Sequence, residues 1–394
     1  MIGDNSHMRF VAGISEKEST SDALDDVLDE VAGSLDNKSD LVFVFCSSHH
    51  IDEAEFLIER IWLELDPQAV VGCSAESVLG VDREVERAPG LVVLAGLLPD
   101  VRIHPFHIGV DAWKHLLDGN LADHVGVGPE TRAIFAFSDP FTTPLNQVLG
   151  AFDRACPGAP LLGGLASAAR QAGGNVLFKN DQVLRDGMVG LSLSGPVDVQ
   201  TVVSQGCRPI GRPFIITKGH DNVIEQLGGK PAIPMLRELM DELPTSEQSL
   251  LENGVFVGRA ISEYRDKFGR GDFLVRNLLG GDEATGAIAL NDHVRVGQTI
   301  QFHVRDASTA DEDLREMLKG YGDASAPAAG LIFSCNGRGR RMFDVPSHDI
   351  RAARDILPKT PLAGFFASGE FGPVGGRNFL HGHTASIALL RRPT

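Results

Sequence analysis

The sequence is short of basic residues and of long apolar runs, and each shortage argues against a class of protein. Its 394 residues include 36 Lys and Arg against 53 Asp and Glu, which gives a net charge of −17. Such a charge repels nucleic acid and anionic membrane surfaces. No apolar stretch reaches the roughly 18–20 residues that span a bilayer. We therefore expect neither nucleic acid nor a membrane as a partner, and a cytoplasmic location.

Cysteines are few, and the usual nucleotide-binding glycine motifs are missing. The five cysteines are odd in number and form no C-x-x-C pair. This pattern predicts reduced thiols rather than a disulfide framework or a zinc site. Neither G-x-G-x-x-G nor G-x-x-x-x-G-K-S/T occurs, so we expect no ATP, GTP or NAD and no other cofactor.

What the sequence does contain is an internal repeat. Residues 159–167 align without a gap on residues 360–368, and residues 69–76 form a looser third copy. An apolar run that ends in Ser or Cys precedes each copy, and another strand-like segment follows it. The intervals from the last Phe of each run to the repeated Gly are 27, 26 and 31 residues, counted from Phe45 to Gly72, from Phe137 to Gly163 and from Phe333 to Gly364. Each interval has room for one helix and two short loops.

The predicted fold is therefore α/β, with repeated β-α-β-β units, mixed sheets and helices on the sheet faces. Residues 51–61 and 348–357 have the apolar spacing of helices. The segment from about 224 to 307 differs, because it alternates as short strands separated by Gly, Asp and Asn. We expect two halves: residues 8–215 with two units, and residues 216–394 with an antiparallel insert and the third unit.

Five motifs occur in order along the chain: SQGCRPIG at 204–211, VGQTIQFHVRDA at 296–307, FSCNGRG at 333–339, GEFGPV at 369–374 and HGHT at 381–384. Together they make the chain resemble the FIST domain, named for F-box and intracellular signal transduction. The resemblance implies a sensory module that binds small ligands such as amino acids. Some FIST relatives are fused to signalling domains or to an F-box. This chain has no room for such a fusion, so we expect any downstream signalling protein to be a separate chain.

Candidate ligand-binding residues follow the predicted strands, where ligands of α/β sheets usually lie. Arg338 lies between two glycines and offers a planar fork for a carboxylate or phosphate. Glu370 is a candidate acceptor for a ligand ammonium or a partner for Arg338. The alternatives are a solvated Arg in a glycine-rich turn and a structural ion pair without a ligand.

Other residues are predicted to line the same pocket. Asn336, Gly337, Gly339, Ser74 and Ser167 are the polar or backbone lining. Arg377 and Asn378 are weaker candidates for the rim. His381 and His383, two apart in a predicted strand, are taken as hydrogen-bonding groups of the pocket wall rather than metal ligands.

Two other functions stay open. Cys335 lies beside Arg338, with His381 or His383 elsewhere in the fold, so a thiol-dependent hydrolase or transferase is one alternative to a sensor. The other is an interaction scaffold without a ligand, as the F-box relatives suggest. We expect a ligand-binding sensor rather than an enzyme.

Overall fold

The structure is a computed structural model that describes residues 7–35, 38–264, 268–269, 271–321 and 326–393. The chain forms two compact units. Unit 1 runs up to Val203 and resumes over Leu314–Leu380 and from Thr384 onward, whereas unit 2 holds Ser204–Asp313 and His381–His383. The division therefore differs from the expected boundary at 215 and 216, because the third repeat belongs to the same unit as the first two.

Each repeat of unit 1 contains the predicted β-α-β-β order. A strand and a helical segment precede this unit, and a hairpin lies between its last two strands. The first repeat consists of β1 (Arg9–Ser15), α1 (Thr20–Leu35), β2 (Ser39–Ser47), α2 (Ala54–Leu65), β3 (Pro67–Ala75), β4 (Ser77–Gly80), β5 (Arg83–Glu86) and β6 (Leu91–Leu97). β2 and β3 are parallel, and β6 runs antiparallel to β2. A parallel pair needs a crossover connection, and α2 provides it.

The second repeat follows the same order, with several short helical turns in place of one long first helix. It consists of β7 (Arg102–Ile108), the helical turns between Val110 and His124, β8 (Thr131–Ser138), α5 (Leu145–Ala155), β9 (Leu161–Leu165), β10 (Leu177–Lys179), β11 (Gln182–Leu184) and β12 (Met188–Ser194). β8 and β9 are again parallel.

The third repeat is interrupted by the insert after its first strand. It consists of β13 (Asp198–Gln205), α8 (Ala307–Lys319), β21 (Ala329–Cys335), α9 (His348–Ile356), β22 (Leu362–Ala367), β23 (Glu370–Val374), β24 (Arg377–His381) and β25 (Thr384–Arg391). β21 and β22 are parallel, and β25 runs antiparallel to β21.

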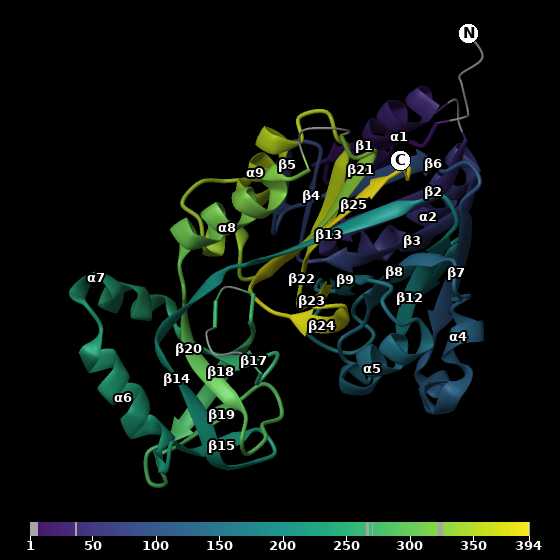
Figure 1. Cartoon of the computed structure of the whole chain (residues 1–394). Helices are drawn as coiled ribbons and strands as arrows, with labels where there is room; N and C mark the ends of the chain where they lie inside the picture. The colour runs from purple at the N-terminus through teal and green to yellow at the C-terminus, as the bar shows by residue number, and fades with distance from the viewer. Residues whose placement is uncertain (1–6, 36–37, 265–267, 270, 322–325, 394) are drawn as a thin grey trace. The chain divides into compact units, whose positions relative to one another are not determined.

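The three repeats exchange hairpins in a cycle. The described part of unit 1 contains three sheets with the orders β1-β6-β2-β3-β10-β11, β7-β12-β8-β9-β23-β24 and β13-β25-β21-β22-β4-β5. The hairpin of the second repeat thus completes the first sheet, that of the third repeat completes the second, and that of the first repeat completes the third. In Figure 1 the blue-purple β4 lies beside the yellow-green strands of the third repeat. Repeats far apart in sequence are therefore joined by strand pairing.

The repeated glycine has one steric cause in all three copies. A Cβ atom at Gly72, Gly163 or Gly364 would lie 1.7, 2.1 or 1.8 Å from a carbonyl oxygen of the neighbouring parallel strand. Real Cβ atoms do not approach backbone so closely. The position therefore accepts only glycine without a shift of the strands.

The inner faces of the three sheets meet in one core. The last Phe of each apolar run lies there: the ring centroids of Phe45 and Phe137 are 5.2 Å apart, those of Phe137 and Phe333 are 5.9 Å apart, and those of Phe45 and Phe333 are 6.5 Å apart. These are favourable separations for aromatic rings. Helices α1 and α2, the helical segments of the second repeat, and helices α8 and α9 pack on the outer faces. The prediction of an α/β fold with mixed sheets and helices on the sheet faces is confirmed.

Unit 2 is built from the insert. It consists of β14 (Cys207–His220), β15 (Val223–Leu227), β16 (Lys230–Pro231), α6 (Ala232–Glu242), α7 (Thr245–Gln248), β17 (Val255–Ala260), β18 (Phe273–Asp282), β19 (Ala287–Leu290) and β20 (Thr299–Arg305). The strand order is β14-β20-β17-β18-β19-β15-β16, with a further pairing of β14 to β15, and the paired strands are antiparallel. Among the described residues, no helix combines the length and apolar composition that crossing a membrane requires.

Candidate functional site

Arg338 lies in the loop between β21 and α9 and is completely buried in unit 1. Its Nε and Nη2 each donate a hydrogen bond of 2.7 Å to the carboxylate of Asp349, the second residue of α9. Ser334 donates a further bond of 2.6 Å to Asp349. Although burial disfavours a charged Asp349, the adjacent Arg338 holds the pKa of this carboxyl well below its usual range. The alternative of a solvated Arg338 in a surface turn is therefore wrong.

The loop that carries Arg338 is held by the hairpin β4–β5 of the first repeat. Glu84 accepts hydrogen bonds from the backbone N–H groups of Asp349 and Ile350, at 2.8 and 3.1 Å. Glu86 accepts from the backbone N–H of Arg340. Gly339 has a φ of +58°, and a Cβ there would lie 2.7 Å from the carboxylate of Glu86. Gly339 therefore serves the backbone of this loop, as the glycine-rich pattern indicates.

Glu370 is the first residue of β23 and has no solvent exposure. Its Oε2 accepts hydrogen bonds from the hydroxyl and backbone N–H of Thr384, at 2.7 and 3.3 Å. Burial raises the pKa of Glu370 to about 8, and the hydrogen bonds from Thr384 and Cys335 and the charge of Arg338 offset only part of that effect. At neutral pH the carboxyl of Glu370 is therefore mostly protonated.

Three buried polar atoms of this region have no hydrogen-bond partner among the described residues. They are Nη1 of Arg338, Oε1 of Glu370 and Oδ1 of Asn336. The thiol of Cys335 lies close to two of these residues, since it influences the pKa of both Arg338 and Glu370. The backbone N–H of Gly337 donates to Sγ of Cys335 at 3.5 Å. Arg338, Glu370, Asn336 and Cys335 thus form one cluster, which we call the Arg338–Glu370 cluster.

Ser74 and Ser167 bind backbone groups at the ends of the repeated strands. The hydroxyl of Ser74 accepts from the backbone N–H of Val176 at 2.9 Å. The hydroxyl of Ser167 accepts from the backbone N–H of Glu76 at 2.9 Å and donates to the carbonyl of Phe366. Ser167 therefore links all three repeats, and both serine hydroxyls are occupied by backbone.

The remaining predicted residues lie elsewhere. The amide of Asn378 is buried and bonds to Asp153 and to backbone groups at the start of β9, and the exposed Arg377 has its Nε 3.9 Å from Asp153. These contacts join β24 to α5.

His381 and His383 belong to unit 2. β24 ends at His381, and His383 has a φ of +61° and bonds to Asn277 at 2.9 Å. The expectation that the two rings share a strand face is wrong because the strand has already ended.

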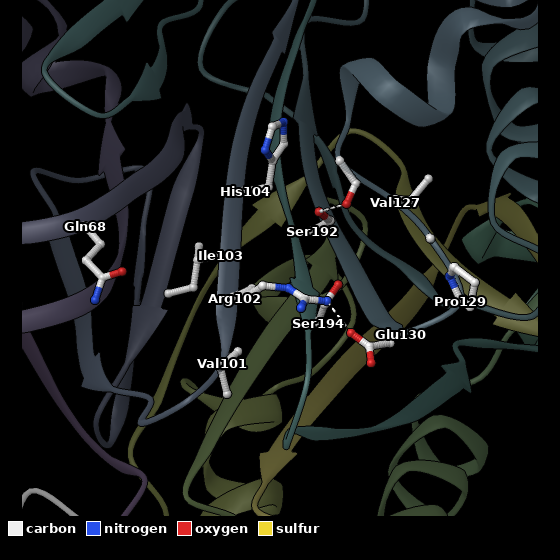
Figure 2. A pocket seen from close by; sticks show the side chains of 12 residues that line it. Gln68, Val101, Arg102, Ile103, His104, Val127, Pro129, Glu130, Ser192 and Ser194 are labelled. Carbon is white, nitrogen blue, oxygen red and sulfur yellow. Dashed lines mark hydrogen bonds and ion pairs between the residues drawn. The ribbon is translucent and has the colours of Figure 1, made fainter.

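A hollow on the surface of unit 1 involves none of the predicted residues. It has a volume of about 860 Å³ and is bordered by β7, β12, Gln68 and the loop 126–130. Figure 2 shows the ion pair of Arg102 with Glu130 and the hydrogen bond of Ser192 to the Gly126 carbonyl at this hollow. These polar groups already bind one another, so the hollow presents few unsatisfied groups to a ligand.

Sequence reasoning missed two residues that shape the Arg338–Glu370 cluster. Asp349 was visible only as an acidic residue at the start of a predicted helix, where it would favour the helix dipole. Glu84 lies more than 250 residues from the loop that it holds. No local sequence signal connects the two, because the hairpin exchange between repeats brings them together.

Comparison with known proteins identifies the family. The FIST N domain model matches residues 40–230, and the FIST C domain model matches residues 232–373. The uncharacterized protein Rv0628c of Mycobacterium tuberculosis is 38% identical over 97% of this chain and 99% of its own length. The uncharacterized protein Mb0898c of Mycobacterium bovis is 38% identical over 97% of this chain and 98% of its own length.

A solved structure of cyanuric acid hydrolase, described as an innovation by structural concatenation, is also similar, with a TM-score of 0.30 and 9% identity over 98% of this chain and 100% of the other. Between them the two domain models match most of this sequence. The chain therefore belongs to the FIST family, whose domains serve sensory signal transduction.

Proposed function

We propose that this protein is a cytoplasmic sensor that binds a small molecule, an amino acid or another small carboxylate, at the Arg338–Glu370 cluster. The observation that carries the proposal is the set of three buried polar atoms without a protein partner, on Arg338, Glu370 and Asn336. Ser74, Ser167, Arg377 and Asn378 have structural partners, so they are left out of the proposed site. The signal passes to a separate signalling protein.

Energetics favour a bound molecule in this cluster. More than nine in ten buried polar groups in proteins are hydrogen-bonded. An unsatisfied buried donor or acceptor costs about 1–3 kcal/mol. Arg338 and Glu370 are at most 1% exposed, and their open atoms lie on side chains that other contacts hold in place. A ligand that pairs with all three atoms removes this cost, which is how the site gains affinity from a preformed geometry.

The open atoms suit a carboxylate ligand. Nη1 of Arg338 is a charge-assisted donor, the kind of group that binds carboxylate oxygens most strongly. Asn336 supplies an acceptor and is half-buried, as is Gly337. The ligand therefore enters past the loop 336–337, beyond the end of β21, which agrees with the usual place of ligands in α/β sheets.

The test is a thermal-shift screen of the twenty common amino acids, their 2-hydroxy acid analogues and their amides. A compound at about one hundred times its dissociation constant stabilises the protein by about 2.7 kcal/mol. Asn336→Ala should remove most of this shift. Arg340→Ala is the matched control, since Arg340 lies in the same loop with an exposed side chain and should keep the shift. No shift with any compound in the wild-type protein would refute the proposal.

One observation favours the second candidate, a thiol-dependent enzyme. Cys335 accepts a backbone hydrogen bond and lies near the cationic Arg338, and both features stabilise a thiolate. Against it, Cys335 is buried, with 9% exposure. Rapid stoichiometric alkylation of Cys335 near neutral pH would support the enzyme over the sensor.

A further inference from the structure

We infer that Glu370 acts in the ligand site as a neutral acid that donates a hydrogen bond from Oε1, and that the site therefore selects ligands without net charge. This inference rests on the proposed function, because it assigns roles within the same cluster. It reverses the role expected from the sequence, in which an ionised Glu370 accepts the ammonium of the ligand.

Hydrogen-bond geometry distinguishes the two oxygens of Glu370. Oε2 accepts from both the hydroxyl and the backbone N–H of Thr384. Those two donors make Oε2 the carbonyl-like oxygen of the acid. Oε1 is a buried atom without a hydrogen-bond partner among the described residues, so we place the proton on Oε1.

The charges around the site are already balanced without Glu370. Arg338 is the guanidinium of the cluster, and Asp349 neutralises it through two hydrogen bonds. Glu84 is a further buried carboxyl beside Asp349, and its Oε2 also lacks a partner among the described residues. An ionised Glu370 would add an uncompensated negative charge to a buried region, which is costly.

The pKa values agree with this arrangement. Burial raises the pKa of Glu370 to about 8. Burial, reinforced by Asp349, raises the pKa of Glu84 to about 8 as well. The other described titratable groups that face the region are Cys335, Glu86, which accepts from the backbone of Arg340, and His348, whose Nδ1 lies 2.9 Å from Asp349. At pH 7 Arg338 and Asp349 therefore form an ion pair, and Glu370 and Glu84 are neutral acids.

The site then offers two donors and one acceptor to a ligand. Nη1 of Arg338 and Oε1–H of Glu370 donate to a carboxylate, and Oδ1 of Asn336 accepts from an ammonium or another donor. A zwitterion or a neutral polar molecule keeps the buried charge balanced. A plain anion adds one unpaired negative charge, and a plain cation finds no ionised acceptor, so both bind more weakly.

Glu370→Gln tests the assignment, because an amide keeps a donor and an acceptor but never ionises. The probes are alanine, serine and glutamine, each compared with its 2-hydroxy acid (net −1) and its amide (net +1), measured by isothermal titration calorimetry. At pH 7, Glu370→Gln should bind the amino acid within about threefold of the wild type, and each charged analogue should bind at least about tenfold more weakly. From pH 7 to pH 9 the wild type should lose about tenfold more affinity for the amino acid than Glu370→Gln, since the side chain of residue 370 ionises only in the wild type.

The outcomes separate this inference from the proposed function. A loss of about a hundredfold or more at pH 7 in a folded Glu370→Gln protein shows that Glu370 accepts as a carboxylate, which overturns the inference and leaves the sensor intact. If none of these probes binds the wild type, both the inference on Glu370 and the proposed sensor function are refuted. A ligand-independent check is the infrared absorption of neutral carboxyls at pH 7, from which Glu370→Gln should remove the contribution of residue 370. If the wild type and Glu370→Gln have the same infrared absorption in this region, the inference is overturned.

Discussion

The guanidinium of Arg338 and the carboxylate of Asp349 form a bidentate ion pair with both groups at most 1% exposed. The pair joins the loop after β21 to the start of α9. It also leaves one guanidinium nitrogen, Nη1, without a hydrogen-bond partner among the described residues. The same contact therefore stabilises the fold and orients the proposed binding group.

Arg338→Ala should lower the free energy of unfolding by about 3–5 kcal/mol, because it removes the guanidinium that neutralises the buried carboxylate of Asp349. Arg237→Ala is the control: it breaks an ion pair with Glu283 in which both side chains are more than 60% exposed, and should cost less than about 1 kcal/mol. Urea denaturation measures both. A loss for Arg338→Ala as small as that of the control would show that Asp349 is hydrated or neutral in the folded protein.

Gly364→Ala should destabilise the protein by about 3 kcal/mol or more, because its Cβ would lie 1.8 Å from the carbonyl oxygen of Ile332 and the parallel strands would have to separate. Gly33→Ala in α1 is the matched control. Gly33 has no atom within 4 Å of an added Cβ, so alanine there should stabilise the helix by about 0.5–1 kcal/mol. Thermal unfolding distinguishes the two, and a tolerated Gly364→Ala would contradict the steric account of the repeat.

Phe137→Ala should cost about 3–5 kcal/mol, since Phe137 is fully buried and its ring contacts phenylalanines from the other two sheets. Phe141→Ala, at a ring that is 46% exposed, should cost much less. Equal losses in chemical denaturation would mean that the central phenylalanine cluster does not hold the three repeats together.

Glu84→Gln should change how stability depends on pH. Burial raises the pKa of Glu84 from 4.5 to about 8 in the folded protein. Between pH 4.5 and pH 8, Glu84 is therefore protonated in the folded state and ionised in the unfolded state. Its contribution to stability is complete below pH 4.5 and declines as the pH rises through 8. Between pH 4.5 and pH 8, the free energy of unfolding of Glu84→Gln should rise relative to that of the wild type by about 1.4 kcal/mol per pH unit. Parallel stability curves from pH 5 to 8 would rule out a protonated Glu84.

Alkylation of Cys335 should be at least about tenfold slower in the folded protein than in urea, since its thiol is buried. Mass spectrometry of peptides after timed alkylation measures the rate at each of the five cysteines. Cys46, which has no exposure and a pKa raised by burial to about 12, is the slow reference within the same molecule. Fast modification of Cys335 alone would favour the thiol-dependent enzyme.

The sequence alone determined the repeat and its local elements. The interval from each Phe to the repeated Gly predicted one helix between two strands, and α2, α5 and α9 lie in those intervals. The glycine itself was recognisable because a single steric demand, room for a carbonyl of the next strand, recurs in every copy. Such signals are local in the chain, so they can be read without the fold.

Only the tertiary structure decided the partners of the site residues. Arg338 and Glu370 were identified from their neighbours in sequence, but the pairing of Arg338 with Asp349 and the hold of Glu84 on α9 depend on the exchange of hairpins between repeats. The protonation of Glu370 likewise depends on burial, which no residue pattern specifies. Strand pairing between distant repeats and the desolvation of charges are properties of the packed molecule, because both arise from groups that meet only after the chain has folded.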